Sequence, residues 1–314
     1  MRVYNFDDLA ESELLYGGHA GRKLGVRIDG ENWFLKFPKS TRSFATEVGM
    51  SYSTSPLSEY IGSHVYESIG IPVHETLLGI RDGKLVVACK DFRSDAIKYR
   101  LDDYDSISNI YVEGLDEKLS ELSSSRSHVV DLDELMIVMQ DNPVFKKCPR
   151  LKDRFWDMFV VDALIGNNDR NNGNWGILVH TQTKEIAIAP VFDNGASFNH
   201  NSSDEKIERI LKDPQSFRMS AYDSRRCAFG LADRAINPFL YIEQMENADC
   251  NQAVRRVVPR ICLSALFDMI REIPTEFDGV PIISDARKEF YCACLQYRYE
   301  KSLLPTYEHL TDGA

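Results

Sequence analysis

Three side chains that carry oxygen atoms, Asp169, Asn174 and Asp193, lie within the segment 165–198, which reads IGNNDRNNGNWGILVHTQTKEIAIAPVFDNGASF. Phosphoryl transfer from ATP needs a carboxylate at the acceptor hydroxyl and oxygen ligands that hold Mg²⁺ against the phosphates. Asp169 has the residue type for the first task, and Asn174 and Asp193 have the types for the second. Asparagine-rich loops are also common as plain turns, so the rest of the chain must decide between these interpretations.

The elements around these residues must bring them to one place. Asn174 follows Asp169 by five positions in a run rich in Asn and Gly, which favours an irregular loop. Two alternating apolar runs at 175–179 and 185–189 then predict a hairpin. Such a hairpin would return Asp193 to the loop that precedes it.

Asp193 itself follows the apolar Val191 and Phe192, so it is expected where a buried strand ends. Gly195 is expected to let the backbone turn sharply after it. An apolar stripe at 155–164 predicts a core helix leading into the loop.

A glycine-rich run at 16–23 precedes two apolar runs, 24–28 and 33–37, joined by an Asp-Gly turn. This order predicts a β-hairpin under a glycine-rich turn. Backbone N–H groups of such a turn can bind phosphates, although an ordinary surface loop is the simpler interpretation and no Walker A ending is present. The candidate phosphate-binding residues are Gly17, Gly18, His19, Ala20 and Gly21.

Lys36 lies in the second strand of this hairpin, on the same face as Phe34. It either extends to water or meets ATP phosphates as a point charge. Ser55 as N-cap and Pro56 at the first helical position predict a helix that runs to about residue 69. Glu59 on this helix is a candidate partner for Lys36, but helical periodicity places it opposite the apolar face, toward solvent.

A second hairpin is predicted from 77–80 and 84–89, joined by Arg-Asp-Gly. It ends in Cys89, Lys90 and Asp91. A strand that leaves a small sheet here can present backbone groups to the edge of an adenine ring.

In this order the parts resemble the HipA-like protein kinase family, most closely its short stand-alone members of the CtkA type. The resemblance covers roughly the first two thirds of the chain and is specific in combination. The segments that carry it are FLKFP at 34–38, SEYIGSHVYESIGIPVHETLLG at 58–79, VVACKDF at 86–92, FWDMFVVDALIGNNDRNNGNWG at 155–176 and APVFDNGASF at 189–198.

The resemblance implies an α+β, bilobal protein-kinase-like fold, with a small β-rich N-lobe at 1–92 and a larger, mainly helical C-lobe at 93–314. It implies a serine/threonine protein kinase that uses ATP and Mg²⁺ and phosphorylates itself. The implied roles are Asp169 as catalytic carboxylate, Asn174 and Asp193 as Mg²⁺ ligands, Lys36 as phosphate lysine, Glu59 as its partner, and Cys89, Lys90 and Asp91 as the adenine-binding hinge. It also suggests a small antitoxin-like partner.

Several residues depart from the pattern of conventional protein kinases. Asn168 precedes Asp169 where those kinases have His-Arg, and Arg170 follows it. Asn194 replaces the Phe of Asp-Phe-Gly, and no Ala-Pro-Glu follows. Ordinary activation-loop control is therefore not expected.

Two other functions share these motifs. A small-molecule kinase of the aminoglycoside-phosphotransferase kind uses the same catalytic logic, and a nucleotide-binding interaction module without catalysis needs only part of it. Retention of Lys36, Asp169, Asn174 and Asp193 together argues against a silent module.

The composition agrees with a cytoplasmic enzyme. A chain of 314 residues with 43% hydrophobic residues can bury a sizeable core. The net charge of −11, from 37 basic and 48 acidic residues, opposes broad binding to nucleic acids or anionic membranes. No run approaches the roughly 20 apolar residues of a membrane span, no signal peptide is visible, and the seven scattered cysteines are typical of reduced thiols.

Two serine- and threonine-rich segments, 40–55 and 119–127, have the composition of loops. As sites of function they would be autophosphorylation sites, whereas a polar linker is the simpler interpretation for each serine. Substrate selection is expected in the region after Asp193 and cannot be derived from its sequence.

Overall fold

The strands near the N-terminus form a five-stranded sheet in the order β1-β4-β5-β3-β2. The structure is a computed structural model, and it describes residues 2–14, 16, 22–40, 53–93, 98–104, 106–107, 129–148, 150–232 and 234–312. The predicted glycine-rich turn at 17–21, the serines at 41–52 and those at 119–127 lie outside the described residues. The strands of this sheet are β1 (Tyr4–Asn5), β2 (Lys23–Ile28), β3 (Glu31–Lys36), β4 (Thr76–Arg81) and β5 (Lys84–Lys90).

Both hairpins predicted for this sheet are confirmed. β2 pairs with β3 and β4 pairs with β5, each antiparallel. The turn residues Asp29, Gly30, Asp82 and Gly83 all have positive φ, which is the geometry that an Asp-Gly turn supplies between twisted strands. The sheet has apolar side chains on both faces. One face forms a small cluster of its own, made of Phe6, Val26, Trp33, Leu35, Phe37, Val86 and Ala88.

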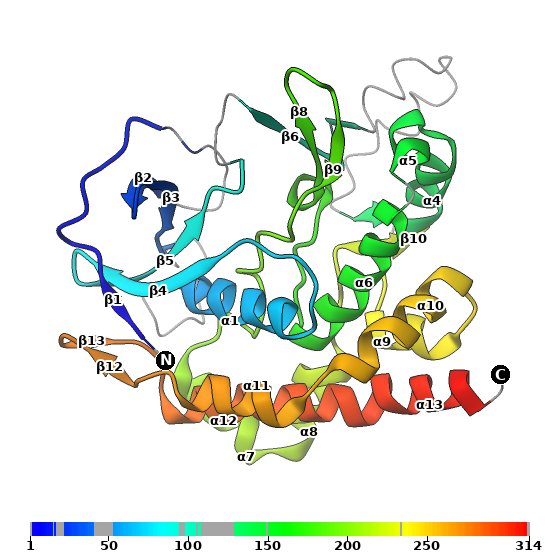
Figure 1. Ribbon diagram of the computed structural model, residues 1–314. Coiled ribbons are helices and arrows are strands. Elements are labelled where there is room, and N and C mark those ends of the chain that lie inside the picture. Colours follow the sequence, from blue (N-terminus) through cyan, green and yellow to red (C-terminus); the bar gives the residue numbers. More distant parts are fainter. Residues whose placement is uncertain are drawn as a thin grey trace.

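The other face of the sheet packs against helix α1 (Ser55–Ser68), where Leu78 and Val87 join the main core with Leu57 and Ile61. Figure 1 shows α1 beneath β4 and β5, with the helices of the rest of the chain beyond it. The N-cap is Thr54, one residue earlier than predicted, and it makes no side-chain capping bond. Proline at the start of the helix is confirmed.

Helix α6 (Arg150–Ile165) lies at the centre of the larger, mainly helical part. Its aromatic and aliphatic residues are buried, as the apolar stripe predicted. The helix ends at Ile165, and the next residue, Gly166, has a φ of 68° that reverses the chain. The carbonyl of Leu164 accepts a hydrogen bond from the buried guanidinium group of Arg298, and the carbonyl of Gly166 accepts one from the half-buried Arg225. These bonds fix the point from which the next loop departs.

The remaining elements complete the larger part. A three-stranded sheet in the order β6-β8-β9 contains the third predicted hairpin, which is confirmed by the β8–β9 pairing. Helices α12 and α13 run along the base of the molecule in Figure 1. In the described residues, every helix is too short or too polar to cross a bilayer. These elements are β6 (Tyr99–Asp103), β7 (Val130–Asp131), α4 (Leu132–Asp141), α5 (Pro143–Lys147), η1 (Asn172–Asn174), β8 (Gly176–His180), β9 (Ile186–Ile188), α7 (Asp204–Lys212), α8 (Pro214–Arg218), η2 (Met219–Asp223), β10 (Phe229–Leu231), β11 (Arg234–Ala235), α9 (Pro238–Gln244), α10 (Ala248–Val257), η3 (Val258–Arg260), α11 (Leu263–Arg271), β12 (Glu276–Phe277), β13 (Val280–Pro281), α12 (Asp285–Arg298), η4 (Tyr299–Leu303) and α13 (Leu304–Asp312).

Candidate active site

The loop after α6 is held in shape by asparagine side chains that bond to its own backbone. Asn167 Oδ1 accepts a hydrogen bond from the N–H of Asp169 at 3.1 Å, and Asn174 Nδ2 donates to the carbonyl of Asp169 at 2.7 Å. Asn171 Nδ2 donates to the Asp169 carboxylate at 3.1 Å, and Asn171 Oδ1 accepts from the N–H of Gly173 at 3.0 Å. The many asparagines of this loop thus have a structural role. Their side chains hold Asp169 through hydrogen bonds to its N–H, its carbonyl and its carboxylate, in place of a helix or strand.

Lys36 of β3 joins two acidic residues from distant parts of the chain. Its Nζ lies 2.7 Å from Glu59 Oε2 on α1 and 2.9 Å from Asp193 Oδ1. Burial alone would lower the pKa of Lys36, but the two carboxylates raise it above its ordinary value. Burial alone would also raise the pKa of Glu59, yet Lys36 and His74 hold it below its usual range. The lysine therefore stays cationic and Glu59 anionic near neutral pH.

The outward position that periodicity predicted for Glu59 is wrong. Its side chain is 1% exposed and forms the ion pair that the family resemblance implied. The cause is that α1 is buried on two sides, by the sheet and by residues 194–195. Gly62 marks the second contact, since a Cβ built there would lie 2.9 Å from the Asn194 Cβ.

The turn after Asp193 also differs from its predicted form. The residue with the left-handed backbone is Asp193 itself, with φ 61°. Gly195 instead provides space, because a Cβ there would lie 3.2 Å from Glu59 Oε2 and 3.3 Å from the Ser55 carbonyl. The glycine thus lets the chain pass close to the ion pair.

A cavity of about 280 Å³ lies beside these groups. Its lining includes Lys36, Glu59, Asp169 and Asp193, so the structure brings four of the predicted site residues together. Asn174 is 8% exposed and does not line the cavity, but its amide is bonded to the carbonyl of Asp169. The oxygens of Asp193 and Asn174 are of the hard type that Mg²⁺ prefers, so this donor set fits the ion.

The predicted hinge residues lie at the end of β5, which is paired on both edges by β3 and β4. Cys89 is fully buried, and the N–H groups of Lys90 and Asp91 already donate to backbone carbonyls at 2.9 Å. The Asp91 carboxylate accepts from Tyr16 Oη at 3.0 Å and from Arg93. The adenine contact of these three residues stays a prediction, and it would have to use carbonyl groups of the strand end.

Comparison with known proteins decides the family. No family model matches the chain. The serine/threonine-protein kinase CtkA of Helicobacter pylori strain J99 is 34% identical over 287 residues, which are 91% of this chain and 82% of that protein. The chain belongs to the HipA-like kinases of the CtkA type.

The crystal structure of the proinflammatory kinase CtkA of Helicobacter pylori matches this CtkA-type kinase with a TM-score of 0.86 and 28% identity, covering 100% of both chains. A HipA structure from Shewanella oneidensis MR-1, solved with HipB and operator DNA, matches with a TM-score of 0.51 and 13% identity, covering 96% of this chain and 70% of that one. The second likeness shows the fold alone. Together the comparisons confirm the α+β, bilobal kinase-like fold.

The residues that depart from conventional kinases form a network of their own in this CtkA-type kinase. Arg170 is 1% exposed and forms two hydrogen bonds with Asp162 of α6 at 2.8 and 3.1 Å. It also donates to the carbonyls of Asn174 and Phe192 and, at 2.6 Å, to Asn194 Oδ1. One guanidinium therefore connects the loop that carries Asp169 to the segment that carries Asp193.

From the sequence, Arg170 is visible only as a departure from conventional kinases, and neither its pairing with Asp162 nor a role for His74 was predicted. The sequence did hold a signal for the pairing of Arg170 with Asp162. Asp162 is an acidic residue in an otherwise apolar helical run, and such a residue usually has a buried cation nearby. Burial alone would lower the pKa of Arg170, but the charge of Asp162 raises it. For His74 no comparable signal exists in the sequence.

Proposed function

We propose that the chain transfers the γ-phosphoryl group of ATP, with Mg²⁺, to serine or threonine hydroxyls of a protein, and that it also phosphorylates itself. The observation that supports this most is the placement of Lys36 between Glu59 and Asp193 at a cavity that Asp169 also lines. Family membership with a relative named serine/threonine-protein kinase favours a protein hydroxyl over a small molecule. The ion pair between Lys36 and Glu59 argues against a nucleotide-binding interaction module without catalysis.

In the proposed reaction Asp169 accepts the proton of the acceptor hydroxyl as its oxygen bonds to the γ-phosphorus. The bond from that phosphorus to the β–γ bridging oxygen breaks, and its electron pair leaves on ADP. Lys36 binds phosphate oxygens as a fixed positive charge. Asn174 and Asp193 would hold Mg²⁺, which neutralises charge on the phosphates when bound.

We propose the remaining nucleotide contacts and the partners from the resemblance to the family. Residues 17–21 are proposed to cover the phosphates, and Cys89, Lys90 and Asp91 to meet adenine. The serines and threonines at 40–55 and the serines at 119–127 are the candidates for autophosphorylation. A small antitoxin-like protein is a further proposal, for which the HipA likeness supplies fold similarity only. Direct nucleic-acid binding is not expected, and a cytoplasmic location stays a prediction.

The proposal is tested by intact mass spectrometry after incubation with ATP and Mg²⁺, alone and with a protein extract. We expect covalent phosphate on the chain itself or on extract proteins, at serine or threonine. The Asp169→Asn variant serves as the control and should gain none. A wild-type protein that labels neither itself nor any protein would contradict the proposal, and labelling of small hydroxyl compounds alone would identify a small-molecule kinase.

A further inference from the structure

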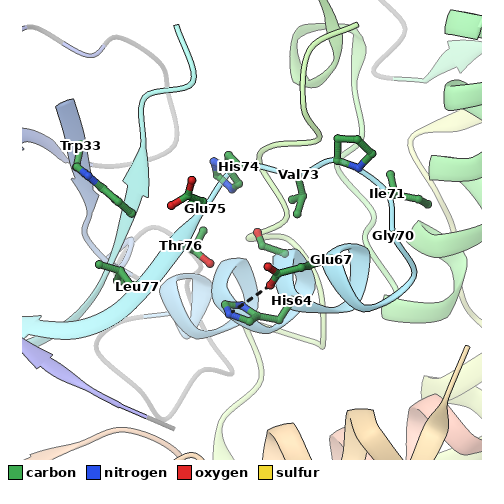
Figure 2. A pocket seen from close by; sticks show the side chains of 12 residues that line it. Trp33, His64, Glu67, Gly70, Ile71, Val73, His74, Glu75, Thr76 and Leu77 are labelled. Atoms are coloured by element: carbon green, nitrogen blue, oxygen red, sulfur yellow. Dashed lines mark ion pairs between the residues drawn. The ribbon is translucent and has the colours of Figure 1, made fainter. Parts of the chain in front are cut away.

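His74 lies in the short segment between α1 and β4 and contacts Glu59 at the carboxylate oxygen that does not bond to Lys36. Its Nε2 is 2.9 Å from Glu59 Oε1, and both side chains are 1% exposed. Figure 2 shows His74 beside a cavity of about 490 Å³, together with His64 and Glu67 of α1. The reaction proposed above does not use this histidine.

The two oxygens of Glu59 have different partners. Oε2 accepts from Lys36, whereas Oε1 accepts from His74 and from the N–H of Asn194 at 3.0 Å. A buried carboxylate is stable only when donors replace its lost water. Since an ionised carboxylate cannot donate, the proton of the imidazole must lie on Nε2. These donors hold the carboxylate in the rotation that turns Oε2 toward Lys36.

The backbone around His74 contacts the strand that leads to Asp193. The N–H of His74 donates to the carbonyl of Val191 at 3.0 Å, and the N–H of Val191 donates to the carbonyl of Pro72 at 2.9 Å. Val73 and Val191 thus form a parallel bridge two residues before Asp193. The segment with His74 therefore contacts Glu59 and also pairs with the chain two residues before Asp193.

A metal site is the other chemistry that this cluster allows. One ligand atom each from Glu59, His74 and Cys89 lies within 4.8 Å of the others. Burial raises the pKa of the Cys89 thiol, so the thiolate that a metal needs is disfavoured. A cation here would also compete with the Lys36 ammonium for Glu59. The hydrogen-bonded arrangement is the better account.

We propose that His74 is a positioning residue for phosphoryl transfer, which acts by orienting Glu59 and thereby Lys36. This inference rests on the proposed kinase function. In the described part of the chain, His74 Nδ1 has no hydrogen-bond partner. The bond to Glu59 is accordingly the contact through which the side chain exerts its effect.

The test compares His74→Leu with two polar replacements. Loss of a hydrogen bond to a charged group predicts a fall in kcat/KM for ATP on the order of 10- to 100-fold in His74→Leu. His74→Gln should restore most of it, because its amide nitrogen reaches the place of Nε2. His74→Asn has the same chemistry but is too short, and should not. His64→Leu is the matched control, since His64 lines the same cavity but, among the described residues, pairs within α1, with the carbonyl of Tyr60 and with Glu67.

A double-mutant cycle separates positioning from plain structural support. If His74 acts through Glu59, His74→Leu should have no further effect in a Glu59→Ala background. The same cycle is run on the Kd of a non-hydrolysable ATP analogue by titration calorimetry, with thermal unfolding as the check on folding. Binding thus tests the inference even if the wild type transfers no phosphate, a result that would contradict only the proposed function. Additive effects, wild-type behaviour of His74→Leu, or failure of His74→Gln to restore function would each overturn the inference.

Discussion

At the scale of single residues, the arrangement depends on how one cation is shared between two carboxylates. Asp193 Oδ1 accepts a hydrogen bond from Lys36, and the Asp193 side chain is 27% exposed and lines the cavity. Glu59 is almost fully buried and has its oxygens occupied by donors. The two acids therefore differ in task. Glu59 holds Lys36 in place, whereas Asp193 is the one that we propose as a Mg²⁺ ligand.

Asp193→Asn tests this division of tasks. The variant keeps the shape of the side chain but loses the negative charge that is proposed to hold Mg²⁺. We expect Mg²⁺-ATP turnover to fall on the order of 100- to 1000-fold, the range for loss of one electrostatic group at a transition state. Steady-state kinetics measures this. Asp249→Asn is the control, since Asp249 pairs with Lys152 at 2.9 Å on an exposed surface, and near-normal turnover of a folded Asp193→Asn protein would remove Asp193 from the site.

At the scale of elements, α1 must fit between the sheet and the segment after Asp193. Gly62 allows this approach, because a Cβ there would lie 2.9 Å from the Asn194 Cβ and 3.4 Å from Ile165 Cδ1. The atom that it meets first belongs to a buried side chain near the backbone and cannot move aside easily. The absence of a Cβ at residue 62 thus allows α1 to lie this close to Asn194.

Gly62→Ala is therefore expected to destabilise the protein, although alanine favours a helix. The gain in helix propensity is about 1 kcal/mol, whereas overpacking costs about 1–3 kcal/mol. A fall in Tm together with weaker ATP turnover should result, because α1 carries Glu59 away from Asn194. Ser68→Ala, at the exposed end of the same helix, controls for the helix itself. A more stable and fully active Gly62→Ala protein would show that α1 can shift freely.

Local patterns in the sequence predicted the elements well and their contacts less well. Asp-Gly turns and alternation are properties of neighbouring residues, and all three hairpins were confirmed. Helical periodicity predicted the exposure of Glu59 wrongly, because the second surface that buries α1 comes from Asn194, 135 positions later in the sequence. Arg170 and His74 likewise have partners that only the folded chain brings near. The roles of residues 17–21 stay predictions.

At the scale of the whole molecule, His200 links the two halves of the chain. Its carbonyl accepts hydrogen bonds from the N–H and Oγ1 of Thr54, at the start of α1. Burial, together with the charges of Lys39 and Arg225, lowers the pKa of its imidazole to about 4. The unfolded chain therefore binds this proton more readily than the folded one between about pH 6.5 and pH 4.

Stability should consequently fall as the pH is lowered through this window. The contribution of His200 is at most about 2 kcal/mol between pH 7 and pH 5. Urea unfolding at both pH values measures the effect, and His200→Gln should show a smaller loss than the wild type. An equal loss in both proteins would mean that His200 titrates normally in the folded state.

We propose that Asp169 acts on the acceptor hydroxyl and does not bind the nucleotide. Titration calorimetry of Asp169→Asn with ATP and Mg²⁺, together with the rate of phosphoryl transfer, tests this role. Because the proposed role exists only in the transition state, we expect transfer to be abolished while Kd stays close to the wild-type value. Collapse of ATP and Mg²⁺ binding in a well-folded Asp169→Asn protein would contradict the account and make Asp169 a metal or phosphate ligand.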